Sequence, residues 1–210
     1  MSKNPRSGIL NRWINKIYLH EKTIANLKNK FKKNDPYPYL ELSGFFNENK
    51  AKGLLSALAK ERFYEKNSDL FKFYQTNDIA SSKNSELLDF RYFLASVDFI
   101  RYMEFLTGLN LKPGKIDLAG TLYKDTNFLL CHDDKLEKRK IAFLFYLSNL
   151  EDKDGGSLNL MDAHFKLTRK IRPEFNKFTF FQVSSHSFHE VQELVANKQR
   201  MAFGGWFHDK

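Results

Sequence analysis

The chain has 210 residues, 42% of them hydrophobic and 21 of them phenylalanine, so it can bury one sizeable core. Its single cysteine excludes an internal disulfide, and no apolar stretch has the length of a membrane span. The N-terminus also lacks the apolar region of a secretory signal, so we expect a cytoplasmic protein that does not contact a membrane.

Most of the formal net charge of +9 lies in the first 33 residues. They hold nine Lys or Arg and one acid, Glu21, a net charge of +8, which leaves 25 basic and 24 acidic residues, a net of +1, for the rest. Helical spacing relates seven apolar residues of this segment: Leu10, Trp13, Ile14, Ile17, Ile24, Leu27 and Phe31. Residues 1–33 are therefore expected to form a basic amphipathic helical segment. Its charged face could contact RNA, but the well-formed apolar stripe favours a helix packed on the protein with a solvated outer face.

Two further helices are expected before the strands begin. Leu54, Leu55 and Leu58 mark the first, and residues 86–107 form the second, which ends at Gly108.

Strands dominate from Ile116 onward. The continuous apolar runs 141–147 and 178–183 predict buried strands, and the polar segment 151–156 predicts a turn at the rim of the sheet. The sequence has no internal repeat and no low-complexity linker. Residues 34–210 are therefore expected to form a single domain, mainly β with flanking α-helices.

His132, Asp134 and His189 are candidate metal ligands. If His132 and Asp134 lie on one strand, they face the same side, whereas Cys131 and Asp133 face away. The third ligand must then come from a neighbouring strand. Two imidazoles and one carboxylate around a metal leave half of an octahedron open, which suits a non-haem Fe(II) oxygenase.

Three other histidines follow in the chain, and each has a different interpretation. His186 is three residues from His189, so on a strand the two face opposite sides and only one of them can be a ligand. His164 is expected in a loop, and His208 is expected to be structural. Cys131 is interpreted as a small buried apolar residue, and Asp133 as exposed or hydrogen-bonded around the ligands.

Arg200 is the candidate anion-binding residue. It follows His189 by 11 residues, enough to cross a turn and return on an adjacent strand. Its planar fork of donors suits the far carboxylate of a dicarboxylate such as 2-oxoglutarate. The alternative is a surface arginine that caps a turn, but the apolar alternation of residues 201–206 favours an inward orientation.

Six motifs together carry a resemblance to a known family: residues 129–134, 139–143, 146–147, 155–158, 187–189 and 205–208. They resemble the ribosomal prolyl hydroxylase family of 2-oxoglutarate- and Fe(II)-dependent oxygenases. The match covers residues 116–208 well and residues 35–46 more loosely.

The resemblance implies a double-stranded β-helix, a jelly-roll barrel of the cupin type, supported by the N-terminal helices. It also implies the iron ligands His132, Asp134 and His189. The cosubstrate 2-oxoglutarate would pair with Arg200 through its C5 carboxylate and accept hydrogen bonds from Tyr146 and Tyr123. Without the resemblance, Tyr146 would be interpreted as a core residue.

The activity implied by the resemblance is hydroxylation of a prolyl residue in a protein, with ribosomal and translation proteins as expected substrates. It would require Fe(II), 2-oxoglutarate and O2, and dependence on ascorbate is also expected. Three alternatives remain open: an oxygenase that acts on a small molecule or another side chain, a barrel that binds without catalysis, and an RNA-binding protein that uses its basic N-terminal segment.

Overall fold

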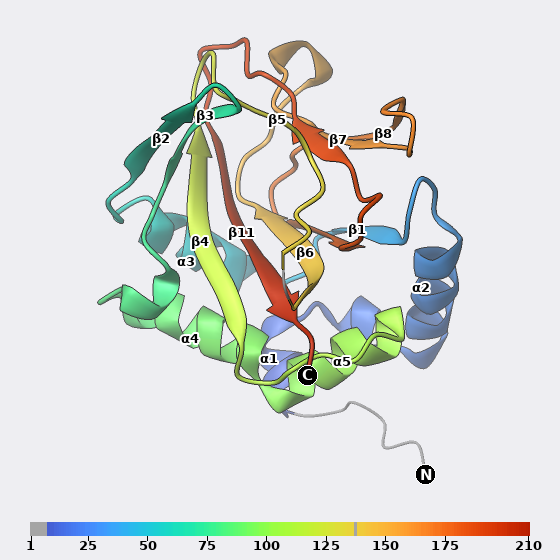
Figure 1. The fold of residues 1–210 in the computed structure, drawn as a ribbon. Helices are drawn as coiled ribbons and strands as arrows, with labels where there is room; N and C mark the ends of the chain where they lie inside the picture. The colour runs from blue at the N-terminus through green and yellow to red at the C-terminus, as the bar shows by residue number, and fades with distance from the viewer. Residues whose placement is uncertain (1–7, 137) are drawn as a thin grey trace.

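The strands form one curled antiparallel sheet that rests on a layer of helices (Figure 1). The computed structural model describes residues 8–136 and 138–210. Within them the sheet has eleven strands in the order β1-β9-β6-β11-β4-β3-β5-β10-β7-β8, with β2 paired to β3. Their bounds are β1 (Tyr39–Ser43), β2 (Tyr64–Ser68), β3 (Phe71–Gln75), β4 (Ile116–Tyr123), β5 (Phe128–His132), β6 (Arg139–Tyr146), β7 (Leu158–Met161), β8 (Leu167–Ile171), β9 (Lys177–Gln182), β10 (His189–Val191) and β11 (Arg200–His208).

The sheet curls into a nearly closed barrel. Strands β1, β9, β6, β11 and β4 form one wall, strands β5, β10, β7 and β8 form the other, and β3 pairs with both β4 and β5. The outer strands β1 and β8 are joined by side chains, since Arg169 Nη2 lies 2.7 Å from Glu41 Oε1. The expected fold, mainly β with flanking helices and a double-stranded β-helix barrel, is confirmed.

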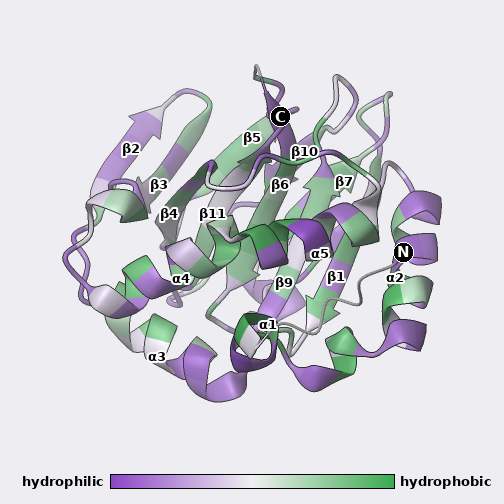
Figure 2. Ribbon diagram, turned by 90° about the horizontal axis from the view of Figure 1, so that it is seen from below, coloured by the Kyte–Doolittle hydropathy of each residue, from purple (hydrophilic) through white to green (hydrophobic). Residues whose placement is uncertain are grey.

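The helices cover one wall of the barrel (Figure 2). Along β6, β9 and β11, alternate phenylalanines point toward the helices and join the largest core cluster: Phe143, Phe145, Phe178, Phe180, Phe203 and Phe207. The residues between them face the barrel interior. This two-sided burial explains the continuous apolar runs of these strands. The helical elements are α1 (Gly8–Trp13), η1 (Lys16–Leu19), α2 (Glu21–Lys33), α3 (Glu48–Leu58), η2 (Ile79–Ser81), α4 (Ser85–Ala95), α5 (Val97–Thr107) and η3 (Asp152–Asp154).

The expected helix over the N-terminal apolar stripe is broken into α1, η1 and α2. Asn15 causes the break, because its backbone N–H donates to Phe45 O at 2.8 Å and its side chain accepts from Ile17 N at 3.2 Å. Both α1 and α2 still bury apolar side chains in the main core, including Trp13 and Phe31. The part of the expected segment in residues 1–7 lies outside the described residues, and the boundary at residue 33 stays a prediction.

The expected single helix over residues 86–107 was also wrong, because it is two helices. Ser96 separates α4 from α5 with an extended backbone (φ −66°, ψ 150°). Its hydroxyl accepts a hydrogen bond from Phe99 N, as an N-cap of α5. Gly108 ends α5 in the left-handed conformation, as expected. Among the helices in the described part of the chain, none combines the length and apolarity needed to cross a bilayer.

Replacing Phe46 should show how strongly the helix layer is attached to the barrel. The ring is 1% exposed and packs edge-on against two other rings. Its centroid lies 4.6 Å from that of Phe145 in β6 and 5.4 Å from that of Phe90 in α4. Phe46→Ala should lower the free energy of unfolding by about 3–5 kcal/mol through the cavity it leaves. Urea unfolding measures the loss, with Phe165→Ala, at a ring that is 59% exposed, as the control expected to cost below about 1 kcal/mol. Equal losses in the two variants would contradict this account of the core.

Candidate metal centre

His132, Asp134 and His189 converge at one end of the barrel interior. His132 ends β5 and pairs in register with His189 at the start of β10, so the neighbouring-strand expectation for the third residue is confirmed. Asp134 Oδ1 lies 3.5 Å from His132 Nε2, and Asp134 Oδ2 lies 3.3 Å from His189 Nε2. One nitrogen or oxygen atom from each residue lies within 4.8 Å of the others. Two imidazoles and one carboxylate at these separations can share one metal ion.

Backbone carbonyls set the orientation of both imidazoles. His132 Nδ1 lies 2.8 Å from Leu130 O, and His189 Nδ1 lies 2.8 Å from Ser187 O. A carbonyl oxygen only accepts, so each Nδ1 carries a proton, and Nε2 is the nitrogen that each ring turns toward Asp134. Carbonyl partners of this kind orient metal-binding histidines. The donor set therefore fits a divalent transition metal.

Asp134 reaches this position in a way that strand alternation does not explain. β5 ends at His132, and Asp134 follows it with φ +60° in the left-handed region, which is uncommon for residues other than glycine. The expectation that both residues lie on one strand was therefore wrong. A tight turn, and not the strand repeat, returns the carboxylate to the face of His132. Asp133 instead accepts a hydrogen bond from Lys135 N in the same turn.

The pKa values of Asp134 and His132 are shifted by the neighbouring groups of the cluster. Burial alone would raise the pKa of the Asp134 carboxyl, but the two imidazoles beside it hold that pKa well below its usual range. Burial lowers the pKa of His132, and the carboxylate of Asp134 outweighs burial and leaves that pKa above its ordinary value. The carboxylate thus stays charged, and the three side chains place potential ligand atoms around one point, as a cation site requires.

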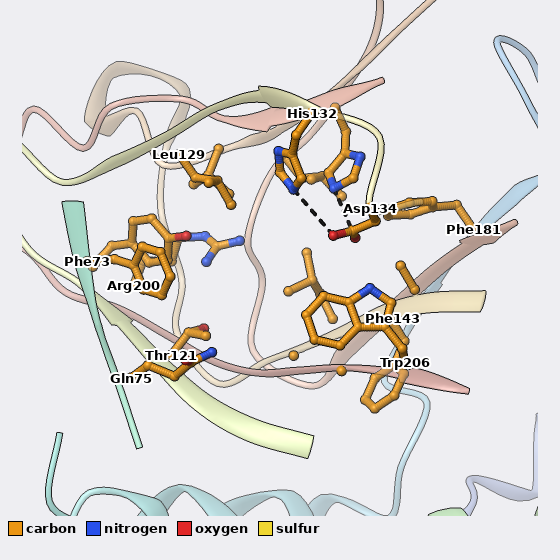
Figure 3. A pocket seen from close by; sticks show the side chains of 18 residues that line it. Phe73, Gln75, Thr121, Leu129, His132, Asp134, Phe143, Phe181, Arg200 and Trp206 are labelled. Atoms are coloured by element: carbon orange, nitrogen blue, oxygen red, sulfur yellow. Dashed lines mark ion pairs between the residues drawn. The ribbon is translucent and has the colours of Figure 1, made fainter. Parts of the chain in front are cut away.

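A cavity of about 110 Å³ extends from this cluster into the barrel (Figure 3). His132 and Asp134 lie at one end, and the guanidinium of Arg200 points into the cavity from the other. Apolar side chains such as Leu129, Leu158 and Phe181 form much of the wall between them. The volume exceeds the roughly 10–15 Å³ that one water needs, so the cavity has room for a small organic ligand.

Arg200 is a fully buried cation with no ion-pair partner in the described part of the chain. Its side chain is 0% exposed, and none of its three guanidinium nitrogens has a hydrogen-bond partner among the described residues. The ring centroids of Tyr123 and Tyr146 lie 4.8 and 5.1 Å from Arg200 Cζ, so both rings make cation–π contacts with the guanidinium. Buried arginines are normally paired, so this one fits an anionic ligand that enters the cavity.

The strand that carries Arg200 lies in a different part of the sheet from the one expected. We expected it on a strand adjacent to that of His189, but β11 lies between β4 and β6, in the opposite wall of the barrel. Its inward orientation agrees with the expectation, because even-numbered positions of β11 face the interior. The two walls therefore present the metal cluster and the cation to the same cavity from opposite sides.

Tyr123 and Tyr146 lie on the strands that flank β11, with Tyr123 directly opposite Arg200 in the register. Tyr123 lines the cavity, whereas Tyr146 lies against Arg200 next to the lining residues, and within the described chain its hydroxyl has no hydrogen-bond partner. Burial raises the pKa of Tyr146 to about 12 even though Arg200 opposes the shift, and burial likewise raises the pKa of Tyr123. Both phenols are therefore neutral donors at physiological pH, and their contact with a cosubstrate stays a prediction.

The sequence reasoning missed several residues that line the cavity. Gln75 and Thr121 approach its Arg200 end, and Trp206 lies below the metal cluster in Figure 3. Arg139 stacks on Trp206, with Cζ 3.5 Å from the ring centroid, and its Nη1 lies 3.8 Å from Asp134 Oδ1. Strand alternation from Arg200 along β11 could have identified Trp206, since both lie at even positions.

The other histidines and the cysteine lie away from the cluster. His164 and His186 are exposed, and His208 Nε2 lies 3.0 Å from Asp117 Oδ2, which agrees with the expected loop, surface and structural interpretations. Cys131 is exposed, so the expectation that it is buried was wrong. It faces outward from β5, in the wall that the helices do not cover, where the outer side of the strand meets solvent.

Comparisons with known proteins agree with this geometry. Residues 118–208 match the family model described as the 2OG-Fe(II) oxygenase superfamily. Prolyl 3-hydroxylase OGFOD1 of Mus musculus is 35% identical over 182 residues, covering 83% of this chain and 33% of the relative. Prolyl 3,4-dihydroxylase OGFOD1 of Ostreococcus tauri is 31% identical over 219 residues, covering 92% of this chain and 42% of the relative.

A solved structure shares the fold. The crystal structure of a Pseudomonas putida prolyl-4-hydroxylase superposes with a TM-score of 0.69 and 19% identity, covering 88% of this chain and 99% of that chain. The chain spans about a third to two fifths of the length of the curated relatives it matches.

Replacing each of two nearby histidines in turn should distinguish a residue of the metal cluster from a surface residue. His189→Ala removes one of the three candidate ligand atoms and should weaken Mn(II) binding at least about 100-fold. His186→Ala, three residues away at an exposed side chain, should leave it unchanged. Anaerobic titration calorimetry with Mn(II) measures both affinities. Similar affinities for the two variants would exclude His189 as a ligand.

Proposed function

Since the chain belongs to the 2OG-Fe(II) oxygenase superfamily, we propose that it is a 2-oxoglutarate-dependent dioxygenase that hydroxylates a prolyl residue in a protein substrate. His132, Asp134 and His189 would hold Fe(II), and Arg200 would bind the far carboxylate of 2-oxoglutarate. The enzyme class follows from the family, whereas the prolyl substrate is inferred from the relatives.

The buried guanidinium of Arg200 is the observation that carries the proposal. A metal site alone is compatible with many reactions, but a cation that is 0% exposed at the far end of the same cavity selects a ligand with a negative charge there. A dicarboxylate that chelates metal at one end and pairs with arginine at the other satisfies both requirements. The buried hydroxyl of Tyr146 has no hydrogen-bond partner in residues 8–136 and 138–210. It would supply a further donor beside the guanidinium.

The residues of the chain would bind, orient and shield the reactants. When bound, Fe(II) supplies the redox chemistry by which 2-oxoglutarate and O2 become succinate and CO2 and one oxygen atom enters a substrate C–H bond. Arg200 and the two tyrosines fix one end of the cosubstrate, so its 2-oxo acid end faces the three ligands. The apolar wall formed by Leu129 and Phe181 keeps water from the reacting centre.

The prolyl substrate is proposed from the names of the relatives, which specify prolyl hydroxylation at C3 or at C3 and C4. We extend the proposal to ribosomal and translation proteins, to ascorbate as the reductant that sustains turnover, and to the cytoplasm as the location. Peptides tiled across such proteins test this step by mass spectrometry. A gain of one oxygen atom on proline supports it, whereas modification of another residue or of a small molecule would favour the alternative oxygenase.

The basic outer face of α2 supports a second proposal, contact with RNA near the substrate. Lys22, Lys30, Lys32 and Lys33 are exposed, while Ile24 and Phe31 on the opposite face are buried in the core. Phosphate contacts predict binding that weakens steeply between 50 and 200 mM salt, by roughly 10-fold or more. Filter binding to single-stranded RNA measures it, and absent or salt-independent binding would remove this proposal.

Turnover without a protein substrate provides the direct test of the enzyme class. Iron-loaded protein exposed to O2 should form succinate from 2-oxoglutarate, and Arg200→Met should lower the rate at limiting 2-oxoglutarate about 30-fold or more, because a buried charge-assisted pair is worth at least about 2 kcal/mol. Arg172→Met, at a side chain that is 45% exposed, is the matched control and should keep the wild-type rate. A wild-type protein without turnover and without Fe(II)-dependent binding of 2-oxoglutarate would favour the non-catalytic binding module.

A further inference from the structure

Arg200 stands directly after an irregular connection, and this connection determines where its side chain enters the barrel. Residues 192–199 link the end of β10 to the start of β11, of which Arg200 is the first residue. Much of the connection is exposed, and Val195 is 60% exposed. Exposed connections are held less firmly than core strands, so the position of this arginine depends on what anchors residues 192–199.

Backbone hydrogen bonds attach the connection to the segment that follows η3. Val195 N donates to Asp154 O at 2.9 Å, and Gln192 N donates to Ser157 O at 2.9 Å. Gly156 N in turn donates to the carbonyls of Gln192 and Glu193 at 3.2 and 3.3 Å. The two segments therefore lie against each other over several residues.

One ion pair fastens the same two segments. Lys198 Nζ donates to Asp154 Oδ2 at 2.6 Å, and the two residues are 44 positions apart in the sequence. The Asp154 side chain is 4% exposed, although that of Lys198 is 42% exposed. Asp154 Oδ2 also accepts from Glu151 N at 2.7 Å and closes a capping box around η3. The carboxylate is thus rigidly held, and it fixes the ammonium of Lys198 two residues before Arg200.

The segment anchored by Asp154 also passes close to the stem of Arg200. Gly156 has φ +70°, and a Cβ added there would lie 3.4 Å from Arg200 Cδ and 2.8 Å from Leu150 Cδ1. The space around the arginine is therefore limited from two directions, by the chain that leads into it and by the turn that passes close to its stem. Neither constraint touches the cavity.

We infer that Asp154 and Lys198 are positioning residues for the cosubstrate cation, an inference that rests on the proposed function. Their ion pair holds residues 192–199 against the η3 turn, so that the guanidinium of Arg200 is already aligned for two parallel hydrogen bonds to a distal carboxylate. A bidentate pair depends strongly on geometry, and small displacements of the donor fork weaken it. The pair thus tunes affinity for 2-oxoglutarate without contacting it.

The test measures ligand binding to Mn(II)-loaded protein by anaerobic calorimetry, so no turnover is needed. Lys198→Met should raise the Kd for 2-oxoglutarate about 5- to 20-fold, and Lys198→Arg should restore most of the affinity. Oxalate chelates the metal but has no distal carboxylate, so its Kd should not change. Lys153→Met is the matched control, since it breaks the exposed Lys153–Glu151 pair in the same turn and should leave both affinities unchanged.

A double mutant checks that the effect passes through Arg200. In an Arg200→Met background, adding Lys198→Met should cause no further loss of 2-oxoglutarate affinity, because the group that is positioned has been removed. Equal weakening of oxalate and 2-oxoglutarate, or equal effects of Lys153→Met and Lys198→Met, would overturn the inference. A wild-type protein that binds oxalate but not 2-oxoglutarate would instead overturn the proposed function, and the inference with it.

Discussion

The structure depends on a positive charge buried at one end of the cavity. Arg200 is 0% exposed, and its guanidinium has no hydrogen-bond partner among residues 8–136 and 138–210, so only the ring faces of two tyrosines moderate its burial. Leaving a buried charge without its partner costs roughly 3–5 kcal/mol in proteins. A chain that maintains this cost is organised around an anion, and the cavity leads from the guanidinium to the three groups that can hold a metal.

The fold makes this arrangement tolerable because the wall that carries Arg200 is rigid. β11 pairs with β4 from Arg200 to Phe207 and with β6 from Ala202 to His208, and its outer face packs on the helices through Phe203 and Phe207. The metal cluster is held differently. His132 and His189 lie on paired strands of the uncovered wall, and a left-handed turn returns Asp134 to them. The site therefore joins the rigid wall to a wall that faces solvent.

The parts of the molecule that follow local rules were predictable from the sequence. The apolar runs of β6 and β9 are buried on both faces and were recognised as strands, and the residue types of the His132, Asp134 and His189 set indicated the metal chemistry. Features that depend on a single turn were not predictable. Asn15 and Ser96 break helices whose apolar spacing continues across them, and the backbone of Asp134 at φ +60° replaces strand alternation.

Contacts between segments distant in the sequence were the other feature that could not be predicted. Nothing in the spacing of His189 and Arg200 indicates that their strands lie in opposite walls, because strand order depends on packing over the whole barrel. The ion pair of Asp154 and Lys198 has the same origin, as two ordinary polar residues become significant only when the fold brings their segments together. Sequence patterns thus indicated the candidate groups of the site but not the ion pair between the segments that support them.

The central claim is that one cavity holds the metal and 2-oxoglutarate at the same time. Anaerobic titration of 2-oxoglutarate into the Fe(II)-loaded protein, followed by visible absorption, tests it most directly, because chelation of Fe(II) by a 2-oxo acid produces a charge-transfer band. The account predicts a saturable band in the wild type, no band in His189→Ala, and a band that needs far more 2-oxoglutarate in Arg200→Met. A protein that binds Fe(II) but develops no band would contradict it.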